Sequence, residues 1–304
     1  MIASDRIHGL AAQAREVGVD LVAKSSGLKH SSIERYLRMS RQTTGVEVKD
    51  APVIGANTLL LDIETSPNVA YVWSCWKVNV APSQLISTSE VLSWAAKWLG
   101  SSKVAFDCRE GERTDKRLVQ TMWNMIDRAD VVVAHYGQGF DEKVLRTRWM
   151  THGIRQPSPY KSIDTLRIAK DAFHFPSNKL DGIARYLGIG KKVEHEGFSL
   201  WTKCMADDHD AWRRMIKYNI GDVELLEQVY LRFRQWDKKH PNLALCFDDG
   251  DTHCVCCGGT RVKKVNKPSR TAVSVFGTYR CLDCGKMMRG VSRKHRDQVL
   301  RNVQ

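Results

Sequence analysis

The sequence lacks the features that would place a protein in a membrane or send it through one. It has no run of 18 apolar residues, and residues 1–18 carry charges where a secretory signal peptide would be apolar. It also has no internal repeat and no low-complexity tract. We therefore expect a soluble, cytoplasmic protein with no membrane partner.

Acidic residues are scarce near the C-terminus. Residues 251–304 contain 3 acidic and 12 basic residues, whereas the whole chain has 34 acidic and 47 basic residues and a formal net charge of +13. Such a segment favours a polyanionic partner. Charge alone leaves two alternatives open, namely nucleic acid binding and a solvated lysine face.

The 304 residues, 42% of them hydrophobic, suffice for one large core and small additional modules. Alternating strand and helix patterns predict an α/β domain at its centre. We expect strands at 58–64, 69–76, 90–98, 103–108 and 130–135, and a helix at 113–129. The full division is a helical module at 1–41, a linker at 42–57, the α/β domain at 58–239, a linker at 240–253 and a cysteine-rich unit at 254–304.

The stretch LLLDIETSP, 59–67, places two acids inside an apolar run. Alternate residues of a strand share a face, so Leu60, Asp62 and Glu64 are expected on one side of the sheet. Buried carboxylates need a basic partner or a cation. A strand end that reaches solvent is the simpler alternative for a single D-x-E pair.

Further acids occur in related contexts. Asp141 begins a predicted helix that follows a buried strand, and Tyr218 and Asp222 are neighbours on one helical face. With Asp62 and Glu64 they form the ordered pattern D-x-E, F-D, Y-x-x-x-D. Taken singly, each of these residues has an ordinary structural explanation, whereas together they form a pattern.

This pattern resembles the three exonuclease motifs of the DEDD, or DnaQ-like, 3′–5′ exonucleases of the ribonuclease H-like superfamily, in the subgroup with tyrosine in the third motif. The resemblance covers residues 58–239 and is closest to a bacterial and phage branch related to family B polymerase proofreading domains. One departure is that His135-Tyr136 stands where such proteins commonly have His-Asn.

The resemblance implies a ribonuclease H-like mixed sheet flanked by helices and hydrolysis of DNA with two Mg²⁺ or Mn²⁺ ions. It implies that four acids hold the ions and that Tyr218 orients the attacking water. The metal ligands would be Asp62, Glu64, Asp141 and Asp222. Asp164 either lies near this site or caps the following helix, and His135 is expected in the core or beside the ligands.

Two C-x-x-C pairs, each followed by glycine, occur in the last 51 residues. Four thiolates at this spacing predict a zinc ribbon with one structural Zn²⁺. The predicted ligands are Cys254, Cys257, Cys281 and Cys284. Cys256 has the wrong spacing, and Cys75, Cys108, Cys204 and Cys246 are expected to be core thiols. Between the pairs, the predicted nucleic-acid contacts are Lys263, Lys264, Lys267 and Arg270.

Residues 1–41 resemble a helix-turn-helix, with a small residue at Ala23 and the turn at Gly27. A small helical bundle without a DNA role matches almost as well. In the helix-turn-helix interpretation, the exposed DNA-binding residues would be Lys29, Ser31, Ser32 and Arg35.

These observations favour a metal-dependent 3′–5′ exonuclease that acts on nucleic acid, with DNA ahead of RNA, and that works with replication or repair proteins. Two alternatives stay open. One is a structure-specific endonuclease of the same superfamily. The other is a non-catalytic DNA-binding regulator whose working parts are the helix-turn-helix and the zinc ribbon.

Overall fold

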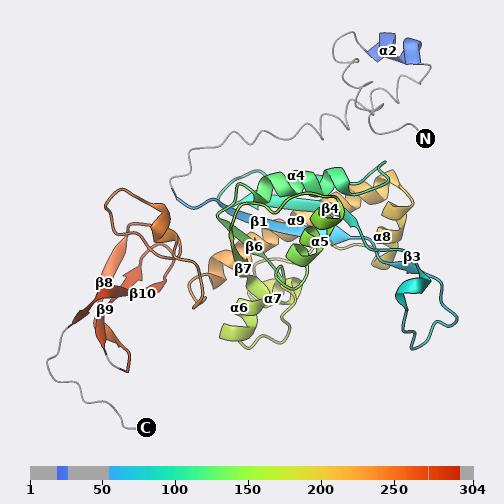
Figure 1. Ribbon diagram of the computed structural model, residues 1–304. Coiled ribbons are helices and arrows are strands. Elements are labelled where there is room, and N and C mark those ends of the chain that lie inside the picture. The colour runs from blue at the N-terminus through green and yellow to red at the C-terminus, as the bar shows by residue number, and fades with distance from the viewer. Residues whose placement is uncertain (1–18, 27–54, 273, 295–304) are drawn as a thin grey trace.

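The protein is described from a computed structural model, which places residues 19–26, 55–272 and 274–294. Its centre is a five-stranded sheet in the order β5-β4-β1-β6-β7 (Figure 1). The strands are β1 (Thr58–Thr65), β4 (Val91–Trp98), β5 (Ala105–Cys108), β6 (Val131–Ala134) and β7 (Lys161–Asp164). The pairs β5-β4 and β4-β1 are antiparallel, whereas β1-β6 and β6-β7 are parallel. The predicted mixed α/β sheet is confirmed.

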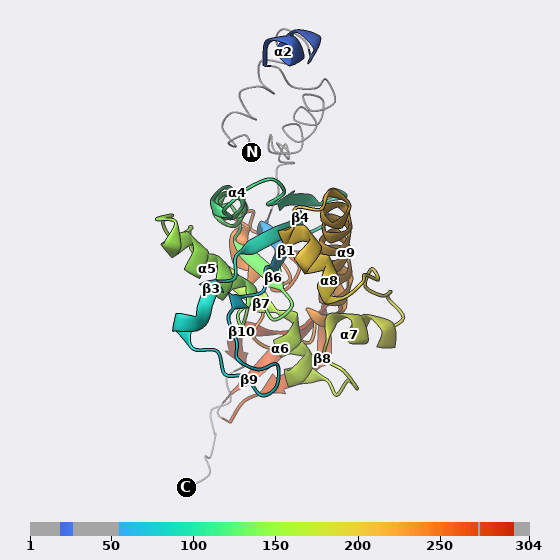
Figure 2. The ribbon, with the colours of Figure 1, turned by 90° about the vertical axis from the view of Figure 1, so that its right-hand side faces the viewer.

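Helices cover both faces of this sheet (Figure 2). They are α4 (Lys116–Ile126), α5 (Asp141–Thr151), α6 (Thr165–Ala172), α7 (Leu180–Tyr186), α8 (Phe198–Met205) and α9 (His209–Phe233). Leu59, Leu61 and Ile63 of β1 pack with α4 and α5, while Leu60 packs on the other side with α9. The alternation predicted for β1 is therefore confirmed, and it points the even-numbered acids toward α9.

The 25-residue helix α9 forms the second wall of the candidate site. Its start is capped by Asp208, whose carboxylate accepts a hydrogen bond from the Ala211 amide at 2.8 Å. Val223, Leu226 and Val229 recur at helical spacing and are buried against the sheet. This apolar stripe holds the helix over β1 and β4 and fixes which of its polar residues face the strand acids.

The predicted strand at 69–76 is wrong over most of its length. Only β2 (Val69–Ala70) is extended, and it pairs with β3 (Leu85–Ser87) after a 3₁₀ turn at Pro82–Gln84. Trp73 is 100% exposed and Trp76 is 86% exposed. We call residues 69–87 the aromatic arm. Its apolar residues produced a strand-like pattern, but no neighbouring strand is available to pair with most of them.

The cysteine-rich unit contains a second sheet in the order β10-β9-β8. Its strands are β8 (Val262–Arg270), β9 (Val275–Cys281) and β10 (Met287–Lys294), and a short 3₁₀ turn, η2 (Leu243–Cys246), precedes them. It contacts the end of α9, where the Cys256 thiol lies 3.4 Å from the Arg234 carbonyl.

Of the predicted helix-turn-helix, the structure describes α2 (Val19–Ser26). The predicted contacts Lys29, Ser31, Ser32 and Arg35 lie outside the described residues. Within the described part of the chain, none of the helices combines the length and the apolar character needed to cross a bilayer.

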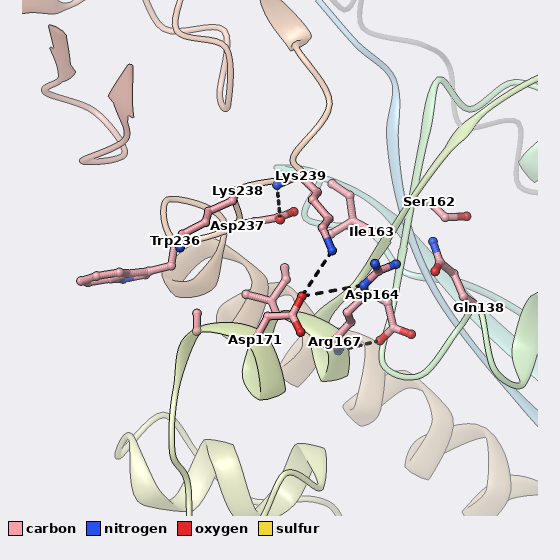
Figure 3. Close-up of a pocket in the computed structure, with 12 residues that line it drawn as sticks. Gln138, Ser162, Ile163, Asp164, Arg167, Asp171, Trp236, Asp237, Lys238 and Lys239 are labelled. Carbon is pink, nitrogen blue, oxygen red and sulfur yellow. Dashed lines mark hydrogen bonds and ion pairs between the residues drawn. The ribbon is translucent and has the colours of Figure 1, made fainter. Parts of the chain in front are cut away.

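A pocket beside α6 is lined by several charged side chains (Figure 3). The Asp171 carboxylate lies 3.8 Å from the Arg167 guanidinium and 3.7 Å from the Lys239 ammonium. Both cations therefore already have an acidic partner, which leaves little net charge at this pocket.

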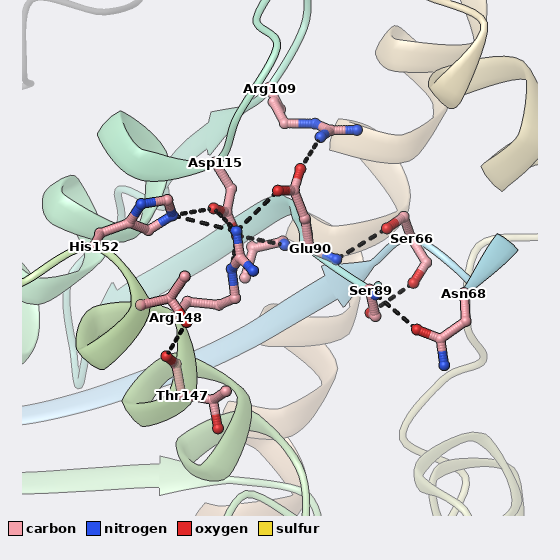
Figure 4. A network of polar contacts seen from close by, with 11 residues as sticks. Ser66, Asn68, Ser89, Glu90, Arg109, Asp115, Thr147, Arg148 and His152 are labelled. Atoms are coloured by element: carbon pink, nitrogen blue, oxygen red, sulfur yellow. Dashed lines mark hydrogen bonds and ion pairs between the residues drawn. The ribbon is translucent and has the colours of Figure 1, made fainter. Parts of the chain in front are cut away.

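A buried polar network joins α4, α5 and the start of β4 (Figure 4). Asp115 is fully buried and accepts hydrogen bonds from the Arg148 guanidinium at 2.7 Å, His152 at 2.7 Å and the Val91 amide at 2.9 Å. Burial alone would raise the pKa of Asp115, but these bonds outweigh it and lower that pKa. Glu90 links Arg148 to Arg109 and so extends the network toward β5.

We expect Asp115→Ala to lower the free energy of unfolding by about 3–5 kcal/mol, because it leaves the Arg148 charge buried without its partner. Asp171→Ala is the matched control. Its ion pairs are exposed, so its effect should stay within about 1 kcal/mol.

Since folding lowers the Asp115 pKa, the stabilising effect of Asp115 should be present above the unfolded pKa of about 3.9 and be lost as pH falls below it. Urea unfolding of both variants between pH 3 and 7 measures this, and equal midpoints would contradict it.

Candidate active site

The strand acids and α9 meet on one side of the sheet. Carboxylate oxygens of Asp62, Glu64 and Asp222 lie within 4.8 Å of one another. Across the antiparallel pair, Asp62 faces Ala95 and Glu64 faces Ser93 on β4. These small residues leave space beside the carboxylates, so the sheet can present both acids to α9.

Asp141 approaches the same strand from the first turn of α5. Its side chain is 3% exposed and accepts a hydrogen bond from the Ile63 amide at 3.2 Å. It is not one of the three residues whose oxygens lie within 4.8 Å of one another. The structure thus brings three of the four predicted acids into one group and places the fourth against the backbone between Asp62 and Glu64.

The carboxylates raise one another's pKa values. Removal from water is the largest cause for Glu64, followed by the charge of Asp222, and together they raise its pKa to about 8. Burial and the neighbouring acids Glu64 and Asp141 raise the pKa of Asp62 well above its usual range. Burial raises the pKa of Asp141 to about 7. Such a group is costly when charged unless a cation joins it.

The hydrogen bonding of these acids also leaves an oxygen atom available to a divalent cation. Asp222 Oδ1 is buried and has no hydrogen-bond partner among the described residues. Hard cations such as Mg²⁺ bind carboxylate oxygens. A free oxygen on Asp222, facing two further carboxylates, is therefore the donor set that such an ion requires.

Three residues that the sequence reasoning did not select contact these acids. Lys192 donates to Asp222 Oδ2 at 2.5 Å, Asn219 donates to Asp62 Oδ2 at 2.6 Å, and Trp201 donates to Glu64 Oε2 at 3.2 Å. Asn219 could have been found, because it lies three residues before Asp222 on the same helix. Lys192 comes from an irregular segment, so no periodicity pointed to it.

Tyr218 lies one helical turn before Asp222, as the spacing predicted. Its hydroxyl accepts a hydrogen bond from Lys192 Nζ at 2.9 Å, and its ring packs edge-on against His195 at 4.7 Å between centroids. The side chain is 7% exposed. Burial, with the Asp222 charge, raises its pKa, so the hydroxyl keeps its proton at neutral pH.

His135 and Asp164 have other partners. His135 hydrogen-bonds to Thr165 Oγ1 at 2.9 Å and to the Asn178 carbonyl at 3.0 Å. Asp164 caps α6 by accepting from the Leu166 amide at 2.9 Å, as in one of the two roles considered for it. Its charge also helps to raise the pKa of Asp141, so it lies near the acids as well. Neither belongs to the close group of three acids.

The four predicted cysteines also come together. The sulfur atoms of Cys254, Cys257, Cys281 and Cys284 all lie within 4.8 Å of one another. Gly258 and Gly285, after the second cysteine of each pair, have φ of +73° and +81°, a conformation that favours glycine. Four converging thiols from two turns suit a tetrahedral metal ion such as Zn²⁺.

The remaining cysteines differ from expectation in part. Cys204 is buried and Cys108 is partly buried, but Cys75 and Cys246 are exposed, so the prediction of a core thiol is wrong for those two. Cys75 lies in the irregular part of the aromatic arm, and Cys246 is the last residue of the short 3₁₀ turn η2. On β8, every predicted nucleic-acid contact is exposed, namely Lys263, Lys264, Lys267 and Arg270.

Residues 98–233 match the family model of the RNase_H superfamily. The match covers less than half of the chain. We call the α/β unit from β1 to α9 the α/β domain. The matched segment contains Asp141, Tyr218 and Asp222, while Asp62 and Glu64 on β1 precede it.

No curated protein matches the chain significantly. Among solved structures, the family B DNA polymerase from the hyperthermophilic archaeon Pyrobaculum calidifontis is similar, with 19% sequence identity and a TM-score of 0.44. The similarity covers 59% of this chain and 25% of the polymerase chain, so this chain spans about a quarter of the polymerase's length.

Proposed function

We propose that this protein is a metal-dependent nuclease that hydrolyses phosphodiester bonds of DNA from the 3′ end. The observation that carries the proposal is the convergence of Asp62, Glu64 and Asp222, with a buried and unpaired carboxylate oxygen on Asp222, in an α/β domain whose residues 98–233 match the RNase_H superfamily model. Tyr218 beside this group favours an exonuclease over an endonuclease, as the resemblance of its motif implies.

In this proposal, the three carboxylates and Asp141 hold two Mg²⁺ or Mn²⁺ ions. Divalent ions at such a site acidify a water molecule and neutralise charge on the leaving oxygen. The protonated Tyr218 hydroxyl orients the attacking water through a hydrogen bond. Lys192, which contacts both Tyr218 and Asp222, fixes the position of that hydroxyl.

The test is hydrolysis of end-labelled single-stranded and double-stranded DNA and RNA with Mg²⁺ or Mn²⁺. A ladder that shortens from the 3′ end is expected for DNA. A single internal cut would instead support the endonuclease alternative. If the protein binds nucleic acid but hydrolyses none of these substrates with either metal, the non-catalytic regulator would be supported.

The basic strand β8 should supply part of the affinity for nucleic acid. Replacing Lys263, Lys264, Lys267 and Arg270 with alanine should reduce the slope of log affinity against log salt concentration by about 2.8 on single strands, at about 0.7 for each phosphate contact. Hydrolysis of a saturating short oligonucleotide should stay within a few-fold, because the acids are in the other unit.

The matched control for this prediction replaces four exposed basic residues of the α/β domain, Lys103, Lys116, Arg128 and Lys143. Fluorescence anisotropy of a labelled strand at several salt concentrations gives the slopes. An unchanged slope in the β8 variant would show that these residues do not touch nucleic acid, and the cysteine-rich unit would then be a candidate protein-docking module.

A further inference from the structure

A groove begins beside the candidate active site. Its walls include Tyr136, Lys170, Asn178, Lys179 and Lys192. Lys192 contacts Asp222 and Tyr218, so one end of the groove adjoins the group of acids. A strand whose end is bound at the acids would therefore continue along this groove.

The groove carries unpaired positive charge. Lys170 and Lys179 are exposed, and no carboxylate among the described residues forms an ion pair with either. Asp181 lines the same groove, but its carboxylate accepts hydrogen bonds from Arg185 at 2.7 Å and from the Lys192 amide at 2.8 Å and does not pair with Lys170 or Lys179. In the pocket of Figure 3, by contrast, Arg167 and Lys239 are paired with Asp171. The groove is thus the better site for an anion.

Tyr136 presents an aromatic ring at this groove from a strained backbone. Its φ is +70°, which is uncommon for a bulky residue, and its side chain is 52% exposed. The conformation is maintained by a hydrogen bond from the Tyr136 amide to Asp164 Oδ1 at 2.9 Å. Strain of this kind is found where the backbone must aim a functional side chain.

Two further residues of the same region are consistent with a built site. A Cβ on Gly139 would lie 2.2 Å from the Tyr136 ring, so only glycine leaves room for the ring there. Asn178 Oδ1 is buried without a hydrogen-bond partner among the described residues. A buried acceptor of this kind commonly marks a group whose partner is a ligand or a water.

We propose that this groove binds the single-stranded end of the substrate, with a base stacked on Tyr136 and backbone phosphates bound by Lys170 and Lys179. This inference rests on the proposed nuclease function. Every base has a flat π face, so stacking on tyrosine tolerates any sequence but requires a base that is not already stacked within a duplex. Tyr136 would thus select single strands or frayed ends rather than a sequence.

The first test is the affinity for a labelled single strand and for a blunt duplex, by anisotropy without added Mg²⁺. Tyr136→Ala should weaken single-strand binding by about 5- to 150-fold and change duplex binding little. Tyr136→Phe should stay within about threefold, because the ring face remains. Tyr136→Gly removes the ring at a position whose φ suits glycine, so it provides a second variant if Tyr136→Ala folds poorly.

Lys170→Ala with Lys179→Ala should lower the salt slope by about 1.4 on single strands. The controls are Tyr186→Ala, an exposed tyrosine outside the groove, and the pair Lys116→Ala with Lys143→Ala on the opposite face of the sheet. Both should bind like wild type. If folded Tyr136→Gly and the double lysine variant also bind single strands like wild type, the subsite is refuted.

Hydrolysis separates this inference from the proposed function. If the wild type degrades DNA, Tyr136→Gly should raise KM for single strands and leave kcat within a few-fold. Hydrolysis with an unchanged KM in this variant would refute the subsite alone. Loss of single-strand binding in a protein that hydrolyses nothing would support the subsite and refute the nuclease function.

Discussion

Asp62→Asn should reduce metal-dependent hydrolysis by roughly a thousandfold or more, while the protein stays folded and still binds DNA. Asp62 shares one face of β1 with Glu64, and Asp141 of α5 lies against the strand backbone between them. The charges of Glu64, Asp141 and Asp222 help to raise the pKa of Asp62. Removing its charge takes away a ligand that the proposed ions need, and with it several kcal/mol of transition-state stabilisation. Time courses on end-labelled DNA with Mg²⁺ measure the loss.

The matched control is Glu224→Gln, which removes an exposed acid from α9 two residues after Asp222. It should keep wild-type activity. Hydrolysis by Asp62→Asn at the wild-type rate would show that the chemistry takes place elsewhere, and the assignment of the site would then be wrong.

The same variant should be more stable than wild type when no divalent ion is present, because it relieves repulsion among closely spaced carboxylates. This repulsion develops only as the pH approaches the raised pKa values of the carboxylates, because the groups are neutral below them. In the wild type, Glu64 binds its proton more tightly when folded, so stability should fall as pH rises from about 4.3, its unfolded pKa, through about 8. Asp62→Asn should reduce that decline, as thermal melts from pH 5 to 9 would show.

Cys281→Ser combined with Cys284→Ser should abolish zinc binding and unfold the unit formed by β8, β9 and β10. Structural zinc in small domains contributes about 10–16 kcal/mol of apparent binding free energy at pH 7, more than a three-stranded sheet of this size can replace. Elemental analysis should show about one zinc per wild-type chain and almost none in the variant.

Cys75→Ser combined with Cys246→Ser is the control, since both thiols are exposed and lie away from the four clustered sulfurs. Zinc content should be unchanged in it. Cys256→Ser should also keep its zinc, because the Cys256 thiol points to the Arg234 carbonyl. A wild-type protein without zinc, or a zinc content unaffected by the loss of Cys281 and Cys284, would refute the metal site.

The parts of the site that could be predicted from sequence are those that obey a local period. The strand period placed Asp62 and Glu64 on one face, and the helical period placed Tyr218 beside Asp222. The proximity of Asp222 to the strand acids came from the resemblance, because pairing across 160 residues of chain has no local signal.

The parts that could not be predicted depend on tertiary contacts. Lys192 lies in an irregular segment, and only the fold brings its ammonium to Asp222. The apolar run at 69–76 has the composition of a buried strand, yet most of it is exposed in the aromatic arm. Apolar side chains favour burial, but a segment is buried only where other elements of the fold supply a surface for it to pack against.

The aromatic arm also determines how the protein should respond to being cut. Chymotrypsin cleaves after large aromatic residues, and Trp73 and Trp76 offer it two exposed bonds. Such a cut separates β1 from the rest of the α/β domain in the covalent chain. It leaves intact the seven residue pairs of β1 with β4, the pairing with β6 and the burial of Leu59, Leu60 and Leu61. The two fragments should therefore remain associated, and the N-terminal fragment would carry Asp62 and Glu64 into a non-covalent complex that still contains the complete group of acids.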